Sequence, residues 1–362
     1  MNTKKKILIA TGGTGGHVIP AYNLAGHFIK KKISVELITD TRGLKFLSNS
    51  TKINITINNS TTIFQKNIFK IPISIIVILV SFLKSLFILK KLKPNIVFGM
   101  GGHSSFPICL AAKVLRIPLY LYEINLFLGK TNKYLLPFAD KIFIAYSDIE
   151  GIKNKYYSKK IFVGNIISEK ILNFKKKKLN QNMDTLSILV LGGSQAARSF
   201  GEFLPLVFEN CLKNKIKLSI FQQCTHNQIN QLDKKYKSLN IKYELFNYKE
   251  NLLEYFDKID FVITRSGASM ISELVNCSIP FIAIPYPYAA DDHQKKNAQY
   301  FKRKGCCFLI EEKNVITNLF PVIKSIHDDK NLLKEMIHQQ SKHSDKEVFN
   351  IIDKKVEKII NE

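Results

Sequence analysis

The first candidate for chemistry is His17, which directly follows a glycine-rich stretch, Thr11–Gly16. The residues before it, Lys6–Ala10, form the apolar run of a buried strand, and Val18–Lys31 after it repeats apolar residues at helical spacing. Glycines let the backbone turn tightly and approach a ligand, and the N-terminus of the following helix favours phosphate. We therefore expect the titratable imidazole of His17 at the rim of an anion site. The alternative is a histidine that caps the turn.

A second group of polar residues lies in the second half of the chain. Thr264–Gly267 ends an expected strand, and Ala268–Leu274 begins a helix that must stop before Pro280. Ser269 and Glu273 are four residues apart and share one face of that helix. A carboxylate at this place can accept both hydroxyls of a ribose. The alternative is a glutamate on a solvated face that interacts with the helix dipole.

The loop Ile284–Ala298 follows the next expected strand and is rich in side-chain oxygens and amides, Gln294 among them. Such a loop suits the hydroxyls of a sugar. It has no Asp-x-Asp motif, so we expect neither a metal nor another cofactor. Six cysteines without a Cys-x-x-Cys pair indicate reduced thiols in a cytoplasmic protein.

Length and charge bound the class of protein. A chain of 362 residues exceeds one hydrophobic core, so two domains are expected. The net charge is +25, but only five of the 54 basic residues are arginine. Because base readout and bidentate phosphate binding depend on arginine, we expect no nucleic-acid partner. An anionic membrane surface or an anionic substrate remains compatible with this charge.

The segment Ile71–Leu89 is almost continuously apolar, with lysines on both sides. A membrane-spanning helix would place the strands before and after it on opposite sides of the bilayer. We therefore favour an interfacial helix that lies on an anionic membrane. A buried core helix and a true span are the alternatives.

Strands and helices alternate along the whole chain, which predicts α/β domains with doubly wound parallel sheets. In the first half the expected strands are 6–10, 34–39, 53–57, 94–98, 118–123 and 141–145. In the second half they are 186–191, 217–222, 242–245, 261–264 and 280–284. Each half has a glycine corner after its first strand, and the first half has another at Gly99–His103. Two Rossmann-like domains facing each other across a cleft are therefore expected, with a polar linker at 173–184 and a helical tail from Asn331 lying across a domain surface.

Five blocks resemble, in order, the MurG-type N-acetylglucosamine transferases that complete the lipid-linked peptidoglycan precursor. They are Gly12–His17, Gly99–Gly102, Gly192–Gln195, Arg265–Glu273 and Ile284–Ala298. The resemblance implies a GT-B architecture with domains at 1–165 and 166–342, and a helix at 343–362 that returns to the first. It implies an inverting transfer from UDP-N-acetylglucosamine to undecaprenyl-pyrophosphoryl-N-acetylmuramyl-pentapeptide. It also implies a peripheral enzyme on the cytoplasmic face of the inner membrane.

The resemblance also implies roles for particular residues, with His17 as the general base. Substrate contacts fall on Thr14, Gly15, Gly16, Asn125, Ser168, Ser194, Lys249, Ala268, Ser269, Met270, Ile271, Ser272, Glu273 and Gln294. Ser168 stands where the family has an arginine and Met270 where it has a threonine, and Tyr122 and Ile124 also depart from its pattern. Either Ser269, Arg265 or Lys249 takes over the lost diphosphate contact, or donor binding is looser.

Some assignments stay open. His103 is a candidate for the acceptor pyrophosphate or an incidental loop histidine. A nicotinamide-dependent dehydrogenase could use the first glycine loop, with Asp40 on the ribose, although this loop lacks the third glycine of that motif. A membrane-associated scaffold could use the face of Ile71–Leu89 alone, and it would leave the two sugar-nucleotide loops without a role.

Overall fold

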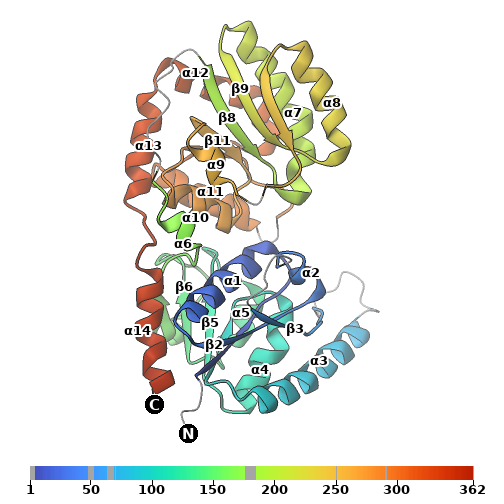
Figure 1. Ribbon diagram of the computed structural model, residues 1–362, viewed down its shortest axis with the longest axis vertical. Coiled ribbons are helices and arrows are strands. Elements are labelled where there is room, and N and C mark those ends of the chain that lie inside the picture. The colour runs from blue at the N-terminus through green and yellow to red at the C-terminus, as the bar shows by residue number, and fades with distance from the viewer. Residues whose placement is uncertain are drawn as a thin grey trace. The chain divides into compact units, whose positions relative to one another are not determined.

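The structure is a computed structural model (Figure 1). It describes residues 5–47, 53–62, 69, 71–175, 185–249, 251–289 and 292–361, without the side chains of 193–197, 358, 360 and 361. The chain divides into two compact units: Met1–Ser168 with Asp345–Glu362, and Glu169–Ser344. We call them unit 1 and unit 2.

Unit 1 is built on a seven-stranded parallel sheet in the order β3-β2-β1-β4-β5-β6-β7. The strands are β1 (Lys6–Ala10), β2 (Ser34–Thr39), β3 (Asn54–Ile57), β4 (Ile96–Gly99), β5 (Leu119–Glu123), β6 (Lys141–Ile144) and β7 (Lys160–Phe162). The order reverses between β1 and β4, which is where ligands bind in such sheets. Ala10 pairs with both Ile38 of β2 and Gly99 of β4. The loops after these three strands therefore start side by side.

The helices of unit 1 connect these strands and cover the sheet (Figure 1). They are α1 (Gly15–Lys30), α2 (Thr41–Leu44), α3 (Ile71–Leu92), η2 (His103–Ser105), α4 (Phe106–Val114), α5 (Lys130–Leu135), η3 (Asn154–Lys159) and α14 (Val348–Asn361). The C-terminal helix α14 packs on α1, where the Phe349 ring stacks on His27 at 4.4 Å between centroids. Asp353 accepts from His27 Nε2 at 2.9 Å and pairs with Lys31 at 2.5 Å. The end of the chain is therefore part of unit 1.

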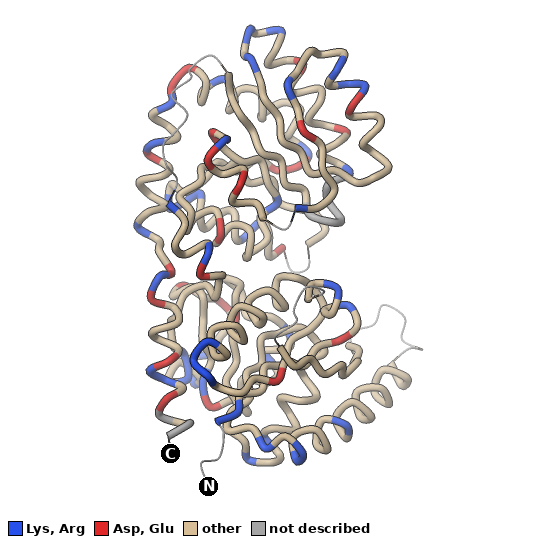
Figure 2. The backbone as a smooth tube through the Cα atoms, viewed as in Figure 1, with Lys and Arg blue, Asp and Glu red and all other residues tan. Residues whose placement is uncertain are grey.

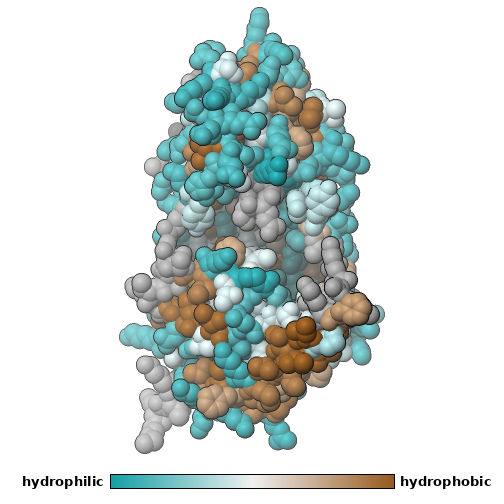
Figure 3. Space-filling view, turned by 90° about the vertical axis from the view of Figure 1, so that its right-hand side faces the viewer, coloured by the Kyte–Doolittle hydropathy of each residue, from teal (hydrophilic) through white to brown (hydrophobic). Residues whose placement is uncertain are grey.

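The outer face of α3 is apolar, and its inner face combines serines with Phe82, Leu86, Ile88 and Leu92, which pack partly buried on the core of unit 1. The buried residues of this helix are three serines and one leucine, Ser74, Ser81, Ser85 and Leu89. Asn58 binds this face through Ser85 Oγ at 2.9 Å. The exposed side chains are Ile73, Ile75, Ile76, Val77, Leu79, Val80, Leu83 and Phe87, and they form a hydrophobic patch on the surface of unit 1 (Figure 3). The buried-helix alternative is therefore wrong.

By length and composition alone, α3 could cross a membrane. Its neighbours in the chain, β3 and β4, belong to one parallel sheet. The chain therefore returns to the side from which it came, and α3 does not act as a span.

Unit 2 has a six-stranded parallel sheet in the order β10-β9-β8-β11-β12-β13. Its strands are β8 (Thr185–Leu191), β9 (Lys217–Gln223), β10 (Lys242–Phe246), β11 (Phe261–Thr264), β12 (Phe281–Ala283) and β13 (Phe308–Leu309). Its helices are α6 (Glu169–Leu172), α7 (Gly193–Lys213), α8 (His226–Ser238), α9 (Leu253–Phe256), α10 (Ala268–Asn276), α11 (His293–Arg303), η5 (Glu312–Asn314), α12 (Val315–Asp328) and α13 (Asn331–Ser341). The order again reverses at the first strand, between β8 and β11.

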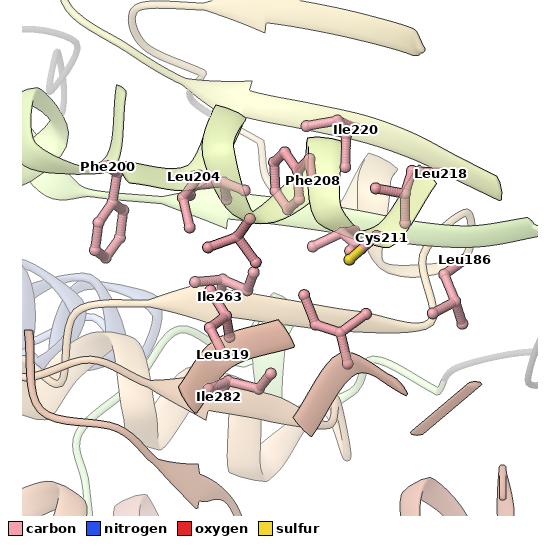
Figure 4. Close-up of a cluster of buried hydrophobic side chains, with 14 of the residues drawn as sticks. Leu186, Phe200, Leu204, Phe208, Cys211, Leu218, Ile220, Ile263, Ile282 and Leu319 are labelled. Carbon is pink, nitrogen blue, oxygen red and sulfur yellow. The ribbon is translucent and has the colours of Figure 1, made fainter. Parts of the chain in front are cut away.

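The core of unit 2 lies between this sheet and its helices. Phe200, Leu204, Phe208 and Cys211 repeat at helical spacing along α7 and point at the strands (Figure 4). All four are fully buried, and each large apolar side chain so buried stabilises the fold by about 1.5–3 kcal/mol. This packing fixes the start of α7 at the end of β8.

The strands predicted from the sequence are present, but β7 and β13 were missed. Both are short and carry only half-buried or exposed residues, so they lack the apolar run that marks a buried strand. The expected linker at 173–184 does not mark the crossing between units, which lies at Ser168–Glu169. Phe174 already packs in unit 2, edge-on to Phe256 at 5.8 Å. Residues 176–184 lie outside the described part of the chain.

Candidate active site

Two glycine loops of unit 1, which follow β1 and β4, pack directly on each other. A Cβ atom on Gly102, whose φ is +80°, would lie 2.2 Å from the carbonyl oxygen of Gly12. A Cβ atom on Gly12 would lie 2.5 Å from Ser104 Cβ. Only glycine permits such an approach of two backbones. The glycines are thus required by loop–loop packing as well as by any ligand.

His17 lies in the first turn of α1, half-buried, with its ring against the second loop. A Cβ atom on Gly101 would lie 2.7 Å from His17 Nδ1. The predicted contacts Thr14, Gly15 and Gly16 open the same turn, and Thr14 is exposed. Among the described residues, no side chain caps this helix start and its first turn has no acidic residue. Its backbone N–H groups and positive dipole end therefore suit an anion.

Asp40, at the end of β2, joins the two loops. Its side chain is 3% exposed and accepts from Gly13 N at 3.2 Å, Ser104 Oγ at 2.7 Å and Gly43 N at 2.8 Å. Arg42 donates to it from Nε at 3.1 Å and from Nη2 at 2.7 Å. Burial alone would raise the pKa of Asp40, but these hydrogen bonds hold that pKa well below its usual range. With both oxygens so occupied, Asp40 is not a ribose ligand, which removes the basis of the dehydrogenase alternative.

Arg42 extends this network to His103. Arg42 Nη2 lies 2.5 Å from His103 Nε2. Burial and the charge of Arg42 lower the pKa of His103, so His103 is neutral at neutral pH and accepts from the guanidinium. Arg42 is assigned no role from the sequence. The signal that could have found it is the spacing Asp40-Thr41-Arg42 directly after the strand next to β1.

Asn125 follows β5 and is oriented by a buried carboxylate. Glu123 is 1% exposed and accepts from Asn125 N at 3.1 Å and Asn125 Nδ2 at 3.0 Å. It also accepts from Asn132 Nδ2 at 2.8 Å. One N–H of the Asn125 amide is therefore engaged, and its other N–H and its Oδ1 can contact a sugar. Ser168 is half-buried at the last position of unit 1.

Tyr122 and Ile124, which differ from the residues of the MurG-type pattern, lie in the interior of unit 1. Tyr122 is 1% exposed and Ile124 is 3% exposed. The Tyr122 hydroxyl donates to Gly164 O at 3.3 Å and accepts from Ile166 N at 3.1 Å. Both residues therefore support the fold and do not offer a side chain to a ligand.

In unit 2, Gln294 ties together the ends of two strands. Its Oε1 accepts from Ser266 N at 3.2 Å, after β11, and from Tyr286 N at 3.0 Å, after β12. Asn297, one turn further along α11, donates to Ser266 O at 3.2 Å. The carbonyl oxygen of Gln294 is thus committed to the backbone, which leaves its NH2 group as the donor for a ligand.

Helix α10 begins directly after Ser266 and Gly267. Within the described chain it has no side-chain cap and no acid in its first turn. Ala268, Ile271 and Ser272 are buried, so their side chains pack in unit 2, whereas Ser269, Met270 and Glu273 are half-buried. Burial raises the pKa of Glu273 to about 7.

Arg265 is not available for a diphosphate. Its side chain is 6% exposed, pairs with Glu312 and donates to Ser199 Oγ at 2.6 Å. It also donates to the carbonyl oxygens of Ile284 and Pro285, both at 3.2 Å. Arg265 therefore holds the loop after β12 in place.

Lys249 forms an ion pair with Glu244 at 3.3 Å and is partly exposed. Ser194 lies in the first turn of α7, and its side chain is outside the described part of the chain. Of the groups expected to replace the lost diphosphate contact, Ser269 is therefore the one at the start of α10.

In the part of the chain that the structure describes, no group of three His, Cys, Asp or Glu side chains could hold a metal ion. The six cysteines are buried thiols. The predicted site residues thus fall into two groups at the carboxyl ends of two parallel sheets, one around His17 in unit 1 and one around Glu273 in unit 2.

Comparisons with known proteins agree with this division. The glycosyltransferase family 28 N-terminal domain matches residues 7–144, and the C-terminal domain of that family matches residues 187–352. Two Rossmann-like units of this kind define a glycosyltransferase with the GT-B architecture. The crystal structure of MurG from Acinetobacter baumannii has this fold, with a TM-score of 0.77 at 24% identity over 97% of this chain and 99% of that one.

The most informative relatives are curated transferases. The chain is 35% identical to the UDP-N-acetylglucosamine–N-acetylmuramyl-(pentapeptide) pyrophosphoryl-undecaprenol N-acetylglucosamine transferase of Pelagibacter ubique, over 98% of this chain and 92% of the relative. It is 32% identical to the enzyme of that name from Rickettsia canadensis, over 98% and 100%. The chain belongs to this MurG family of N-acetylglucosaminyltransferases.

Proposed function

We propose that this protein transfers N-acetylglucosamine from UDP-N-acetylglucosamine to the 4-hydroxyl of undecaprenyl-pyrophosphoryl-N-acetylmuramyl-pentapeptide. The reaction converts lipid I into lipid II and inverts the anomeric carbon. The observation that carries the proposal is the 35% identity to a curated transferase of this name over nearly the whole chain.

Unit 2 binds the donor. Glu273 accepts the ribose hydroxyls, and the NH2 group of Gln294 donates to hydroxyls of the sugar. The diphosphate lies at the uncapped start of α10, near Ser269, and at the start of α7, near Ser194. Backbone N–H groups of Ala268, Ser269 and Met270 in the first turn of α10 contribute to binding, as does that of Lys249; Ile271 N already donates to Gly267 O at 3.1 Å. Support for this arrangement comes from Gln294, which fixes two strand ends with one side-chain oxygen.

Unit 1 binds the acceptor and supplies the base. The 4-hydroxyl oxygen attacks the anomeric carbon, the bond from that carbon to the UDP oxygen breaks, and His17 takes the hydroxyl proton. Unit 1 also reaches the donor: Asn125 Oδ1 contacts its N-acetylglucosamine, and Thr14, Gly15, Gly16 and Ser168 border the donor. UDP leaves with additional negative charge, which the two helix N-termini of unit 2 stabilise.

Helix α3 holds the enzyme on the cytoplasmic face of the inner membrane. Eight exposed apolar residues occupy its outer face, and Lys90 and Lys91 stand in its last turn. Figure 2 shows basic residues at this end of α3. Insertion of the apolar face into the headgroup region, with lysines on anionic lipids, is the binding mode of an amphipathic interfacial helix. This arrangement brings unit 1 to the lipid-linked acceptor.

The test is a transfer assay with purified protein and detergent-solubilised lipid I. We expect UDP release that requires the acceptor, and a product heavier by one N-acetylhexosamine. Parallel reactions with UDP-glucose and UDP-N-acetylgalactosamine measure donor selectivity. Acceptor-dependent release from none of the three nucleotides would contradict the proposal.

A further inference from the structure

The pair Asp40 and Arg42 lies at the junction of the two glycine loops of unit 1, beside His17 but without a part in the mechanism above. We propose that Arg42 binds the diphosphate of the acceptor and that Asp40 is the positioning residue that holds Arg42 there. The inference rests on the proposed function, because that function supplies the anionic acceptor.

The Arg42 guanidinium lies at the rim of both glycine loops. A Cβ atom on Gly13 would lie 3.8 Å from Arg42 Nη2, so the guanidinium lies over the first glycine loop. The same nitrogen is 2.5 Å from His103 of the second loop. Arg42 therefore spans both loops at their rim, and its side chain is 55% exposed.

Arg42 has N–H donors left over for a phosphate. A guanidinium has five N–H groups, and Arg42 uses Nε and Nη2 toward Asp40 and His103. Within the described residues, its Nη1 group has no acceptor. That group can donate to a phosphate oxygen without breaking the pair, and arginine–phosphate hydrogen bonds are among the strongest in proteins.

Asp40 is buried and hydrogen-bonded to both glycine loops. Its side chain is 3% exposed, and its carboxylate accepts from one backbone N–H of the first loop and one hydroxyl of the second. A buried carboxylate with five donors keeps one orientation. Asp40 thereby fixes the two loops relative to each other and fixes the plane of the Arg42 guanidinium.

The experiment compares Arg42→Met with Lys45→Met, which removes another exposed cation next to α2. It also compares Asp40→Asn with Glu36→Gln, a carboxylate on β2. Initial rates are measured against lipid I and against UDP-N-acetylglucosamine, with thermal unfolding of each variant. We expect Arg42→Met to raise the acceptor KM at least about tenfold and to leave the donor KM within about twofold. Arg42→Lys should recover part of the loss, and Asp40→Asn should also raise the acceptor KM.

Binding of farnesyl diphosphate, measured by calorimetry without donor, separates this inference from the proposed function. Binding that weakens in Arg42→Met supports the inference even if the wild-type protein releases no UDP. Equal binding to wild type and Arg42→Met overturns it even if transfer proceeds. An acceptor KM in Arg42→Met no different from that in Lys45→Met also overturns it, as does an equal rise in donor and acceptor KM.

Discussion

At the scale of residues, His17 is placed by a glycine of a different loop. Its ring occupies the space that a Cβ atom on Gly101 would need. The imidazole therefore has a defined position next to the uncapped start of α1. Because histidine is largely neutral at cytoplasmic pH, it can accept a proton there.

Replacement of His17 by alanine tests its role as base. We expect kcat to fall by about 10²–10⁴-fold, the usual contribution of a general base. Affinity for UDP-N-acetylglucosamine, measured by calorimetry, should be nearly unchanged because the proposed contacts to its nucleotide lie in unit 2. A variant that turns over at the wild-type rate would exclude His17 as the base.

If Glu273 binds the ribose as proposed, donor binding should depend on pH. Its pKa is raised to about 7 by burial, so the carboxyl is mostly protonated at pH 6 and mostly ionised at pH 8. The ionised form accepts the ribose hydroxyls, so affinity for UDP-N-acetylglucosamine should rise about tenfold from pH 6 to pH 8. Calorimetric titrations across this range measure the effect, and Glu273→Gln should remove it. Flat affinity in the wild-type protein would show that Glu273 does not bind the ribose as a carboxylate.

The raised pKa of Glu273 also makes the free energy of unfolding depend on pH. The protonated form is favoured in the folded protein, since burial penalises the charge. The contribution of Glu273 to the free energy of unfolding is therefore present below about pH 4.5 and is lost as the pH rises through about 7.

At the scale of elements, α3 is a surface helix whose outer face is apolar as well as part of its inner face. Three serines face the interior, and Asn58 binds one of them. Eight large apolar side chains lie outside, and this exposure is costly in water and favourable against lipid.

Serine substitutions on the outer face of α3 test membrane binding. Ile76, Val80 and Leu83 are between 56% and 61% exposed, so their replacement should leave folding nearly unchanged. We expect the triple variant to lose most of its co-sedimentation with vesicles of anionic phospholipid. Leu206 of unit 2 is 50% exposed, and Leu206→Ser is the matched control. Sedimentation of the triple variant equal to that of the control would contradict the role of α3.

Helix α14 depends on one carboxylate for its contact with α1. Asp353 is 10% exposed and pairs with His27 and Lys31. Asp353→Asn leaves two donors facing an amide, and we expect a loss of about 2 kcal/mol in the free energy of unfolding. Urea unfolding measures it. Glu357→Gln is the control, because Glu357 is 63% exposed and lies 3.8 Å from Lys31, so its loss should cost under about 0.5 kcal/mol.

At the scale of the whole molecule, each unit has a hydrophobic core of its own. The chain crosses between the units after Ser168 and again before Asp345. Near these crossings, Asn165 donates to Asp345 at 3.1 Å, so the outgoing and returning segments meet within unit 1.

Hydrogen exchange tests the assignment of substrates to units. With saturating UDP-N-acetylglucosamine, we expect slower exchange at the starts of α10 and α11 in unit 2, because bound ligand stabilises the segments that it contacts. Exchange in the core strands β1 and β4 of unit 1 should be unchanged. Protection confined to unit 1 would contradict the assignment of the donor.

Much of this protein follows from local sequence. The long apolar runs of the central strands determine their position in the sheets, because a strand buried on both faces has few polar residues. Glycine corners after such strands determine where the loops lie, since parallel strands present their carboxyl ends at one edge. The positions of His17 and Glu273 follow from these two facts.

Other features depend on contacts between residues far apart in the chain. The roles of Asp40 and Arg42 require β2, β1 and β4 to be adjacent, and no short segment encodes that adjacency. Arg265 cannot bind a diphosphate because it pairs with Glu312, 47 residues away. The packing of α3 in unit 1 determines which of its faces points outward. Sequence determines which groups can do chemistry and at which strand ends they stand. Tertiary structure decides which of them are already bonded to the protein, because hydrogen bonds and burial depend on neighbours that only folding brings together.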